Sequence, residues 1–326
     1  MKIMQIDMVY LWCDGNDPQF IRRKNKALGV ENIKDADSVG DVRFYDNEEF
    51  RFSLRSLEKN IPWIHHIYIV TDRQKPYWLK ESEKLTVIDH SQIMPQSLIP
   101  CFNSSVIEKY IHLIPNLSEH FLYSNDDFFF NQPLSPNFFF HEGKPILRVY
   151  QKKKYQSQTV LSGALDAGLW FNSIFRAWRL LSEYHHQFHA YFPHHNVDAY
   201  TKSSYHTTWS RFGSYLEKSN STFRNNTDIE RIIFDLDAAY SGNSILKILP
   251  NIPPWRKQLA TTFPYIFSMH VDSTFEDDDL KHRKRILALH PKLFCLNSSN
   301  TISISEKQSA RHFLEDIFSI PSSFEK

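Results

Sequence analysis

The chain has few cysteines, almost no net charge and no long apolar run. Its three cysteines, Cys13, Cys101 and Cys295, lie far apart and match no CxxC or Cys/His metal spacing, which argues against a disulfide framework and suits a reducing compartment. The formal charge is +1, from 38 Lys and Arg against 37 Asp and Glu, so no global field attracts nucleic acid. No stretch of about 18 apolar residues occurs, and the first residues enter a strand pattern too early for a signal peptide. We therefore expect a cytoplasmic protein that does not bind nucleic acid.

The composition predicts a large globular core. Of the 326 residues, 41% are hydrophobic and 15% are aromatic, enough for one big domain or two smaller ones. No internal repeat, low-complexity tract or linker divides the chain. A basic, aromatic patch at Lys152, Lys153, Lys154 and Tyr155 suits either a membrane face or, more readily, a solvated loop.

Strand and helix patterns alternate in the first 125 residues. Strand patterns occur at 6–11, at IHHIYIVTD, at LTVIDH and at HFLYSNDD. Asp46 and Glu49 form a predicted capping box before a helix in which Phe50, Leu54 and Leu57 share a face. A second helix is predicted from the following apolar positions: Val106, Ile107, Tyr110, Ile111 and Ile114. This alternation predicts an α/β fold, a Rossmann-like and GT-A-like, mostly parallel sheet flanked by helices, with three acidic strand ends on one rim.

The pattern loosens after residue 150. One helix is predicted near 172–188, and a last helix carries Phe313, Leu314 and Ile317. We expect residues 1–150 to form the Rossmann-like half, and residues 151–326 to form a mainly helical and irregular half continuous with it.

The first acidic strand end is in IDMVYLWCDGNDP. An alternating strand at 6–11 leads directly into a turn that contains Asp14, Gly15 and Asp17. Ligands of open α/β sheets gather at the carboxyl ends of strands, so this turn suits a ribose, a base or a metal-bound diphosphate. An ordinary strand followed by a D-G turn explains the pattern equally well.

A group of arginines follows in RFYDNEEFRFSLRSLEKN. Arg51 and Arg55 are four residues apart on one helix face, and Arg43 precedes the helix. Guanidinium groups match phosphate oxygens, so the three could clamp a diphosphate. Alternatively, Glu48, Arg51 and Arg55 form exposed salt bridges.

The segment FLYSNDDFFF places polar side chains within apolar surroundings. Asn125, Asp126 and Asp127 lie between aromatic residues, where buried acids are costly without a cation or hydrogen-bond donors. Adjacent carboxylates at a strand end suit Mg²⁺ that bridges a diphosphate. No organic cofactor is indicated.

Two further segments offer a proton carrier and a cation. His194, His195 and Lys202 lie in or near PHHNVDAYTKS, and a neutral imidazole can take a proton from a sugar hydroxyl. His195 suits an ordinary loop or core position as well. Arg224, in TFRNNTDIE, is a phosphate ligand or a residue that only stabilises a turn.

These motifs together resemble the Stealth family, which includes bacterial capsular and exopolysaccharide phosphotransferases. IDMVYLWCDGNDP resembles the opening region, and the stretch from RFYDNEEF to SNDDFFF resembles the long second region. HHNVDAYTKS through FRNNTDI is similar to the third region, and LFCLNSS to the fourth. The four occur in family order across nearly the whole chain.

The resemblance implies transfer of a sugar 1-phosphate from a nucleotide diphosphate sugar, such as UDP-GlcNAc, to a glycan hydroxyl. An oligosaccharide, polysaccharide or lipid-linked glycan would be the acceptor, and a nucleoside monophosphate would leave. Peripheral association with membrane-bound polysaccharide machinery at the inner face of the membrane is expected.

The resemblance also implies roles for individual residues. The catalytic set is His195 as general base, Arg224 as the group that stabilises the transition state, Asp127 and Asp46. The implied donor-binding set is Asp14, Gly15, Arg43, Asn47, Glu49, Arg51, Asn103, Ser104, Asn125, Lys202 and Asn297. Asp126 and Asp127 would hold Mg²⁺.

Two departures and two rival functions accompany the resemblance. Cys13 stands where the family usually has valine, a harmless exchange. Ser298 follows Asn297 where an aspartate is typical, so one carboxylate is missing and metal dependence is in question.

A nucleotide-sugar glycosyltransferase would use the same acidic strand ends, and a non-catalytic glycan-binding module would keep the aromatic surfaces.

Overall fold

The computed structural model describes residues 4–31, 39–40, 44, 46–151, 155, 168–193, 197–249, 266–271, 283–284, 286–288, 290–298 and 304–326. The strands are β1 (Ile6–Leu11), β2 (Ile67–Thr71), β3 (Leu85–Asp89), β4 (His120–Asn125), β5 (Phe128–Phe130), β6 (Phe140–His141), β7 (Lys144–Gln151), β8 (Tyr191–Pro193), β9 (Asp198–Thr201), β10 (Ile245–Leu249), β11 (Ile266–Val271) and β12 (Leu293–Ser298). The helices are α1 (Pro18–Glu31), α3 (Glu49–Asn60), α4 (Ser104–Ile107), α5 (Leu169–His185), α6 (Lys202–Lys218), α7 (Ile232–Tyr240) and α9 (Ile304–Ile317). Short 3₁₀ helices are η2 (His90–Gln92), η3 (Gln96–Leu98), η4 (Glu108–Leu113) and η5 (Pro136–Phe138).

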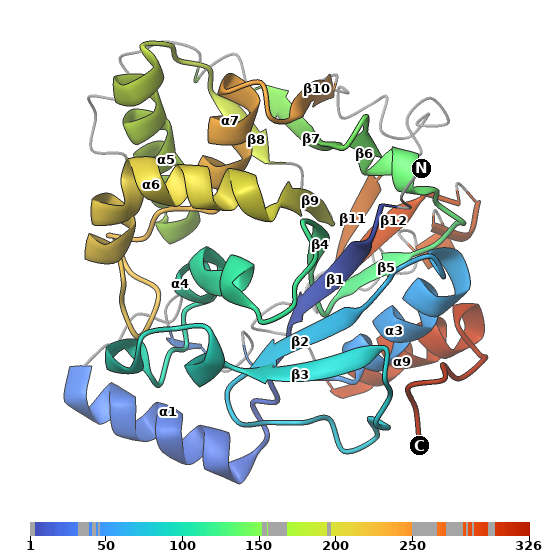
Figure 1. The fold of residues 1–326 in the computed structure, drawn as a ribbon. Helices are drawn as coiled ribbons and strands as arrows, with labels where there is room; N and C mark the ends of the chain where they lie inside the picture. The colour runs from blue at the N-terminus through green and yellow to red at the C-terminus, as the bar shows by residue number, and fades with distance from the viewer. Residues whose placement is uncertain are drawn as a thin grey trace.

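A five-stranded sheet in the order β3-β2-β1-β4-β9 forms the centre of the molecule (Figure 1). The first four strands are parallel, and β9 runs antiparallel to β4. Leu11 of β1 is in register with Val70 of β2 and with Asn125 of β4. The carboxyl ends of these strands therefore meet at one edge, and the predicted Rossmann-like, mostly parallel sheet flanked by helices is confirmed.

The two faces of the sheet bury alternate residues of each strand. Met8 and Tyr10 of β1 belong to the core cluster that includes Phe50 and Leu54 of α3. Val9, between them, belongs to the cluster on the other face with Val106 of α4 and residues of α5, α6 and α7. The period of two along a strand directs neighbouring side chains to opposite faces, so both faces of β1 are buried, as expected of a parallel sheet.

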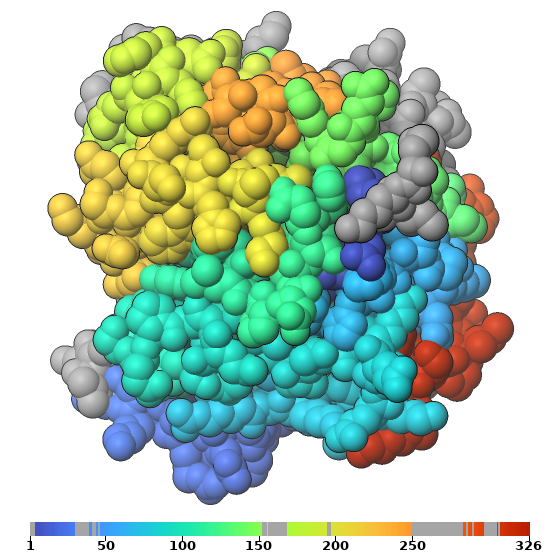
Figure 2. All heavy atoms as spheres, viewed as in Figure 1, coloured from blue at the N-terminus to red at the C-terminus, as the bar shows by residue number. Residues whose placement is uncertain are grey.

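Segments of the second half complete the first. Strand β9 pairs with β4, and β12 pairs antiparallel with β5 through Cys295 opposite Phe128. Helix α6 lies against the 100–120 segment on the face drawn in Figure 2, where the Trp209 ring N–H donates to the Lys109 carbonyl at 2.8 Å. The division at residue 150 stays a prediction. Strand β7 spans that point and pairs in parallel with β10.

One local prediction was wrong, and a second was confirmed only in part. Asp46 and Glu49 do not form a capping box: the N-cap residue is Glu48, in the left-handed region with φ 64, and it makes no side-chain cap hydrogen bond. The predicted second helix is a four-residue α-helix, α4, followed by the 3₁₀ helix η4. The predicted helix at 172–188 is present as α5, three residues earlier at each end.

Candidate active site

A cavity of about 340 Å³ lies at the carboxyl ends of β1, β2, β3 and β4. Its polar lining contains carboxylates, an imidazole, an amide and one guanidinium. The lining residues are Leu11, Trp12, Cys13, Phe20, Phe44, Glu49, Val70, Asp72, His90, Cys101, Phe102, Ser104, Ile107, Asn125, Asp126, Asp127, Arg224 and Leu296. Parallel neighbouring strands bring the three predicted acidic strand ends to this edge.

Asp126 and Asp127 lie in the turn between β4 and β5. The Asp127 carbonyl accepts from the Leu296 N–H at 3.0 Å, and the Cys295 thiol donates to Asp127 Oδ2 at 3.3 Å. Asp127 Oδ1 is buried and has no hydrogen-bond partner in the structure. Strand β12 thus fixes the backbone and one oxygen of Asp127 while the other oxygen is left for a ligand.

Glu49 enters the cavity from the first turn of α3, and Asp46 lies just before it. Asp46 Oδ1 accepts from the Glu48 N–H at 2.9 Å, and Glu49 Oε2 accepts from the Asn47 N–H at 2.7 Å. These bonds hold the corner between the 46–48 loop and the helix. Asn47 Nδ2 donates to the Lys307 carbonyl at 3.1 Å, which joins the same corner to α9.

Burial raises the pKa of four carboxyl groups in and beside the cavity, and neighbouring negative charges raise three of them further. Burial, together with the neighbouring charge of Asp14, raises the pKa of Asp46 to about 7, and burial next to Asp46 raises the pKa of Glu49 to about 7. Burial raises the pKa of Asp127 to about 6. Burial and the charges of Asp127, Asp46 and Glu49 hold the pKa of Asp126 well above its usual range. Such a cluster favours a cation or a protonated partner.

Arg224 is the guanidinium that lines the cavity, and a tightly held loop carries it. The buried Asn103 donates from Nδ2 to Asp228 Oδ1 at 2.9 Å and to the Phe223 carbonyl at 3.2 Å. Lys109 Nζ, also buried, donates to the Ser219 hydroxyl at 2.6 Å. Among the residues that the structure describes, Arg224 Nε is buried without a hydrogen-bond partner. A buried donor with no partner, in a cavity that carboxylates also line, indicates a place for an anionic ligand.

The side chain of Asn125, at the end of β4, is held by a contact with Tyr123. The Tyr123 hydroxyl lies 2.9 Å from Glu108 Oε1 and 3.1 Å from Asn125 Oδ1, yet a phenol has only one hydrogen to donate. Burial holds the pKa of Tyr123 well above its usual range, so the phenol keeps that hydrogen. Arg231, 3.5 Å from Glu108 Oε1, stabilises a negative charge there. The Tyr123 hydroxyl thus contacts both Glu108 Oε1 and Asn125 Oδ1 and holds the Asn125 side chain at the cavity wall.

The first acidic turn supports the cavity rim. Asp14 does not line the cavity: its Oδ1 accepts from the Asn16 N–H at 2.8 Å, and its backbone is held by Gln74 at 3.1 Å and 2.9 Å. A Cβ on Gly15 would meet the Phe44 carbonyl oxygen at 2.4 Å. Glycine is needed at position 15 because the chain touches the Phe44 backbone, and Phe44 lines the cavity.

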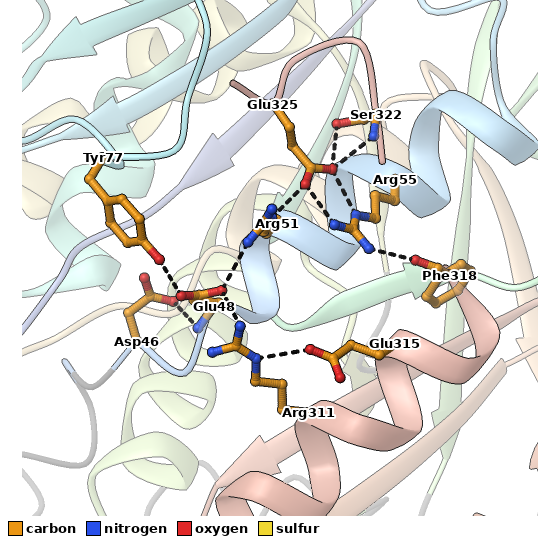
Figure 3. A network of polar contacts seen from close by, with 10 residues as sticks. All are labelled: Asp46, Glu48, Arg51, Arg55, Tyr77, Arg311, Glu315, Phe318, Ser322 and Glu325. Atoms are coloured by element: carbon orange, nitrogen blue, oxygen red, sulfur yellow. Dashed lines mark hydrogen bonds and ion pairs between the residues drawn. The ribbon is translucent and has the colours of Figure 1, made fainter. Parts of the chain in front are cut away.

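Several predicted donor residues lie away from the cavity. Arg51 pairs with Glu325 at 2.5 Å and with Glu48 at 3.3 Å (Figure 3), as the salt-bridge alternative predicted. Lys202 follows β9, which is antiparallel to β4, so it lies at the opposite edge of the sheet and donates to the Leu117 carbonyl at 3.2 Å. Asn103 anchors the Arg224 loop instead of lining the cavity.

Other predicted residues lie outside the part of the chain that can be placed. Arg43 and His195 are outside the described residues, and the side chain of Asn297 is not described. Their predicted roles stay predictions.

Sequence reasoning missed part of the site. His90 and the aromatic side chains of Trp12, Phe20, Phe44 and Phe102 line the cavity without having been predicted there. Asp72 was recognised as an acidic strand end but received no role. Its position after β2, beside the equally acidic end of β1, was the signal that could have identified it.

Metal binding was tested against the donor set. Among the residues that the structure describes, no group of three or more His, Cys, Asp or Glu side chains is placed to hold a metal ion. Mg²⁺ is commonly bound by one or two carboxylates together with substrate phosphates. The unpartnered Asp127 Oδ1 beside Asp126 fits that second mode.

Two family models match the chain. Conserved region 1 of the Stealth proteins matches residues 4–29, and conserved region 2 matches residues 43–147. The chain belongs to the Stealth family. Region 2 contains Glu49, Asp72, Asp126 and Asp127, so most of the acidic lining of the cavity comes from this part of the Stealth sequence.

Relatives of this Stealth protein are named as polysaccharide phosphotransferases. Capsular polysaccharide phosphotransferase cps1A of Actinobacillus pleuropneumoniae is 35% identical over 69% of this chain and 62% of its own length. Exopolysaccharide phosphotransferase SCO6023 of Streptomyces coelicolor is 47% identical over 41% of this chain and 23% of its own. The chain thus spans less than two thirds of these relatives. A capsular polysaccharide phosphotransferase of Actinobacillus suis is 29% identical over 99% of this chain and 84% of its own.

Among solved structures, the glycosyltransferase GlyE of Streptococcus pneumoniae TIGR4 is similar over 97% of this chain and 62% of its own, with 10% identity and a TM-score of 0.40. In the described part of the Stealth chain, every helix is too short or too polar to cross a bilayer.

Proposed function

We propose that this protein is a sugar-1-phosphate transferase of capsular or exopolysaccharide synthesis. It takes a hexose or N-acetylhexosamine 1-phosphate from a nucleotide diphosphate sugar and joins it to a hydroxyl of an oligosaccharide, polysaccharide or lipid-linked glycan. The observation that carries the proposal is a cavity lined both by Arg224, whose Nε has no hydrogen-bond partner among the described residues, and by the carboxylates of Glu49, Asp126 and Asp127. The names of the relatives supply the reaction class.

The proposed reaction is displacement at phosphorus. The acceptor oxygen forms a bond to the phosphorus that carries the sugar, the bond to the bridging oxygen breaks, and a nucleoside monophosphate leaves. The acceptor proton passes to a base. Negative charge increases on the phosphoryl oxygens and on the leaving group, so a fixed guanidinium lowers the barrier. Arg224 is assigned to this role.

Asp127 is the described residue best suited to hold the acceptor. With a pKa of about 6, its carboxylate is charged at neutral pH and more basic than an ordinary aspartate, so it can accept a hydrogen bond or a proton from the hydroxyl. His195 remains the proposed general base from the sequence. Asn125 would present its amide group to a donor or acceptor hydroxyl.

Mg²⁺ is proposed as the cofactor, held by Asp126 and Asp127. When bound, it would neutralise charge on the diphosphate. The other groups are proposed to bind and orient the substrates. Glu49 and Asp46 add carboxylates near Asp126, and Ser104 lies at the cavity wall.

The decisive experiment is product analysis. The protein is incubated with UDP, GDP and CDP sugars and an oligosaccharide acceptor, with and without Mg²⁺, and examined by phosphorus NMR. A new phosphodiester signal with free nucleoside monophosphate supports the proposal. Release of nucleoside diphosphate would show a glycosyltransferase instead, and no product with any donor would favour a glycan-binding module.

The proposed place of action is the cytoplasmic face of the membrane, beside membrane-bound polysaccharide machinery. The support is the names of the relatives, which concern capsular polysaccharides and exopolysaccharides.

A further inference from the structure

A second group of unsatisfied polar atoms lies at the β2 and β3 side of the cavity. Asp72, directly after β2, and His90, directly after β3, both line the cavity. Their strands pair in register, with Thr71 opposite Asp89, so the two residues are neighbours at the sheet edge. Asp72 Oδ1 and His90 Nδ1 are both buried, and neither has a hydrogen-bond partner among the described residues. None of the reaction steps assigned above uses either residue.

Asp72 is held firmly in this position. Arg23 of α1 donates from Nε to Asp72 Oδ2 at 2.8 Å and from a terminal nitrogen to the Asp72 carbonyl at 2.8 Å. The Asp72 side chain is 2% exposed. One oxygen of the carboxylate thereby accepts from Arg23, and the other has no donor in the described part of the chain. A buried acceptor without a donor is costly unless a ligand supplies one.

The missing partner must be a hydrogen-bond donor. A phosphate has no suitable hydrogen and would be repelled by the carboxylate, so the diphosphate belongs near Arg224 instead. One hydroxyl can satisfy both groups, because it can donate its single hydrogen to Asp72 and accept a hydrogen bond from the Nδ1–H of a neutral His90. Burial lowers the pKa of His90 to about 4, so the imidazole is neutral and offers one donor and one acceptor. In dinucleotide-binding α/β folds, an acid beyond the phosphate-binding turn bonds a ribose hydroxyl.

We propose that Asp72 and His90 form the ribose subsite of the donor nucleotide, with Asp72 Oδ1 accepting a hydrogen bond from a ribose hydroxyl. This rests on the proposed function, since it assigns one part of the same donor. It places the nucleoside on the β2 and β3 side of the cavity and the transferred phosphate on the β4 side. Phe20 and Phe102 also line the cavity and contact each other edge to face, with ring centroids 5.3 Å apart.

The test compares ribonucleotides with their deoxy forms. Binding of UDP, CDP and GDP, and of the 2′-deoxy and 3′-deoxy analogue of the tightest one, is measured by calorimetry. We expect the native protein to prefer the ribonucleotide over one deoxy analogue by about tenfold or more, the range of a hydrogen bond to a charged group. In Asp72→Asn, Arg23 would bind the remaining oxygen and the amide NH₂ would face the ligand, so the preference should fall to about twofold or less.

Two further variants make the result specific. Glu49→Gln removes a carboxylate from the same cavity and should keep the ribose preference, whatever it does to turnover. His90→Phe leaves the Arg23–Asp72 pair in place and should reduce the preference, and it supplies the ratio if Asp72→Asn binds neither form measurably. Because each ratio is internal to one protein, partial unfolding of a variant does not imitate the effect.

The outcomes separate the two proposals. Native protein that binds no nucleoside diphosphate overturns the proposed function and this subsite with it. Native protein that binds diphosphates but does not distinguish ribose from both deoxy forms overturns the subsite alone. An unchanged ribose preference in Asp72→Asn also overturns the subsite. The same holds if the variant prefers a different base but still distinguishes ribose from its deoxy forms.

Discussion

The pairing of Glu325 with α3 should make the 318–326 segment a major contributor to stability. Glu325 Oε2 lies 2.7 Å from Arg55 and 2.5 Å from Arg51, and Oε1 accepts from the Ser322 N–H at 2.8 Å (Figure 3). The Glu325 side chain is 2% exposed and Arg55 9%. The change Glu325→Gln keeps the shape and removes the charge, leaving Arg55 buried without a counter-ion.

The magnitude follows from the pKa. Hydrogen bonds from Arg55 and Arg51 lower the pKa of Glu325 from 4.5 to about 2 despite burial. Taken at face value this corresponds to roughly 3 kcal/mol at neutral pH. Arg51 is 24% exposed, and solvent screening reduces the figure, so we expect Glu325→Gln to cost about 2 kcal/mol at pH 7.

The sign of the pH dependence gives an independent check. A carboxyl whose pKa is lower in the folded state stabilises fully above its unfolded pKa, and the stabilisation is lost as the pH falls. The difference between native protein and Glu325→Gln should therefore shrink from pH 4.5 towards pH 2. Urea denaturation followed by tryptophan fluorescence at pH 7, 5, 4 and 3 measures it.

A matched control lies nearby. Glu315 pairs with Arg311 four residues before it, but its side chain is 43% exposed, so Glu315→Gln should change stability by less than about 0.5 kcal/mol. Equal costs for both variants, or a difference for Glu325→Gln that does not change with pH, would refute the reasoning.

Three predictions concern the cavity. Asp127→Asn should lower turnover by roughly a hundredfold or more; a variant that turns over at nearly the native rate contradicts the assignment. Arg224→Gln should lower kcat by about a hundredfold with a smaller change in KM, because the positive charge matters most as negative charge grows on the phosphate; a pure KM effect would limit Arg224 to ground-state binding. Tyr123→Phe should release the Asn125 amide and raise KM for the donor, whereas Tyr200→Phe, a buried tyrosine whose hydroxyl contacts Asp235 at 3.2 Å, should not; equal effects would indicate a purely structural role.

The sheet could be predicted because its signals are local. The alternation of Met8, Val9 and Tyr10 gives strand β1 by itself, and Asp72 and Asp126 follow strands of the same kind. Parallel neighbours necessarily bring such strand ends to one edge. The acidic rim was therefore predictable before any contact was known.

The arginine set shows where local signals stop. The spacing of Arg51 and Arg55 correctly placed both on one face of α3, but the partner on that face is Glu325, 270 residues beyond Arg55. Nothing within the helix distinguishes a phosphate ligand from a salt-bridge partner. Arg224, by contrast, reaches the cavity because Asn103 binds its loop across 125 residues, through Asp228.

The amino acid sequence by itself determined the strands, the helix faces and the acids that end each strand, because these depend on periods of two and of about four residues. Only the tertiary structure decided which charges meet. Lys202 lies away from the site because β9 is antiparallel to β4. Only one oxygen of Asp127 is bonded within the described chain, and its donor is Cys295 of a distant strand. Charge pairing depends on distances in space between residues far apart in the chain, and those distances are fixed by packing alone.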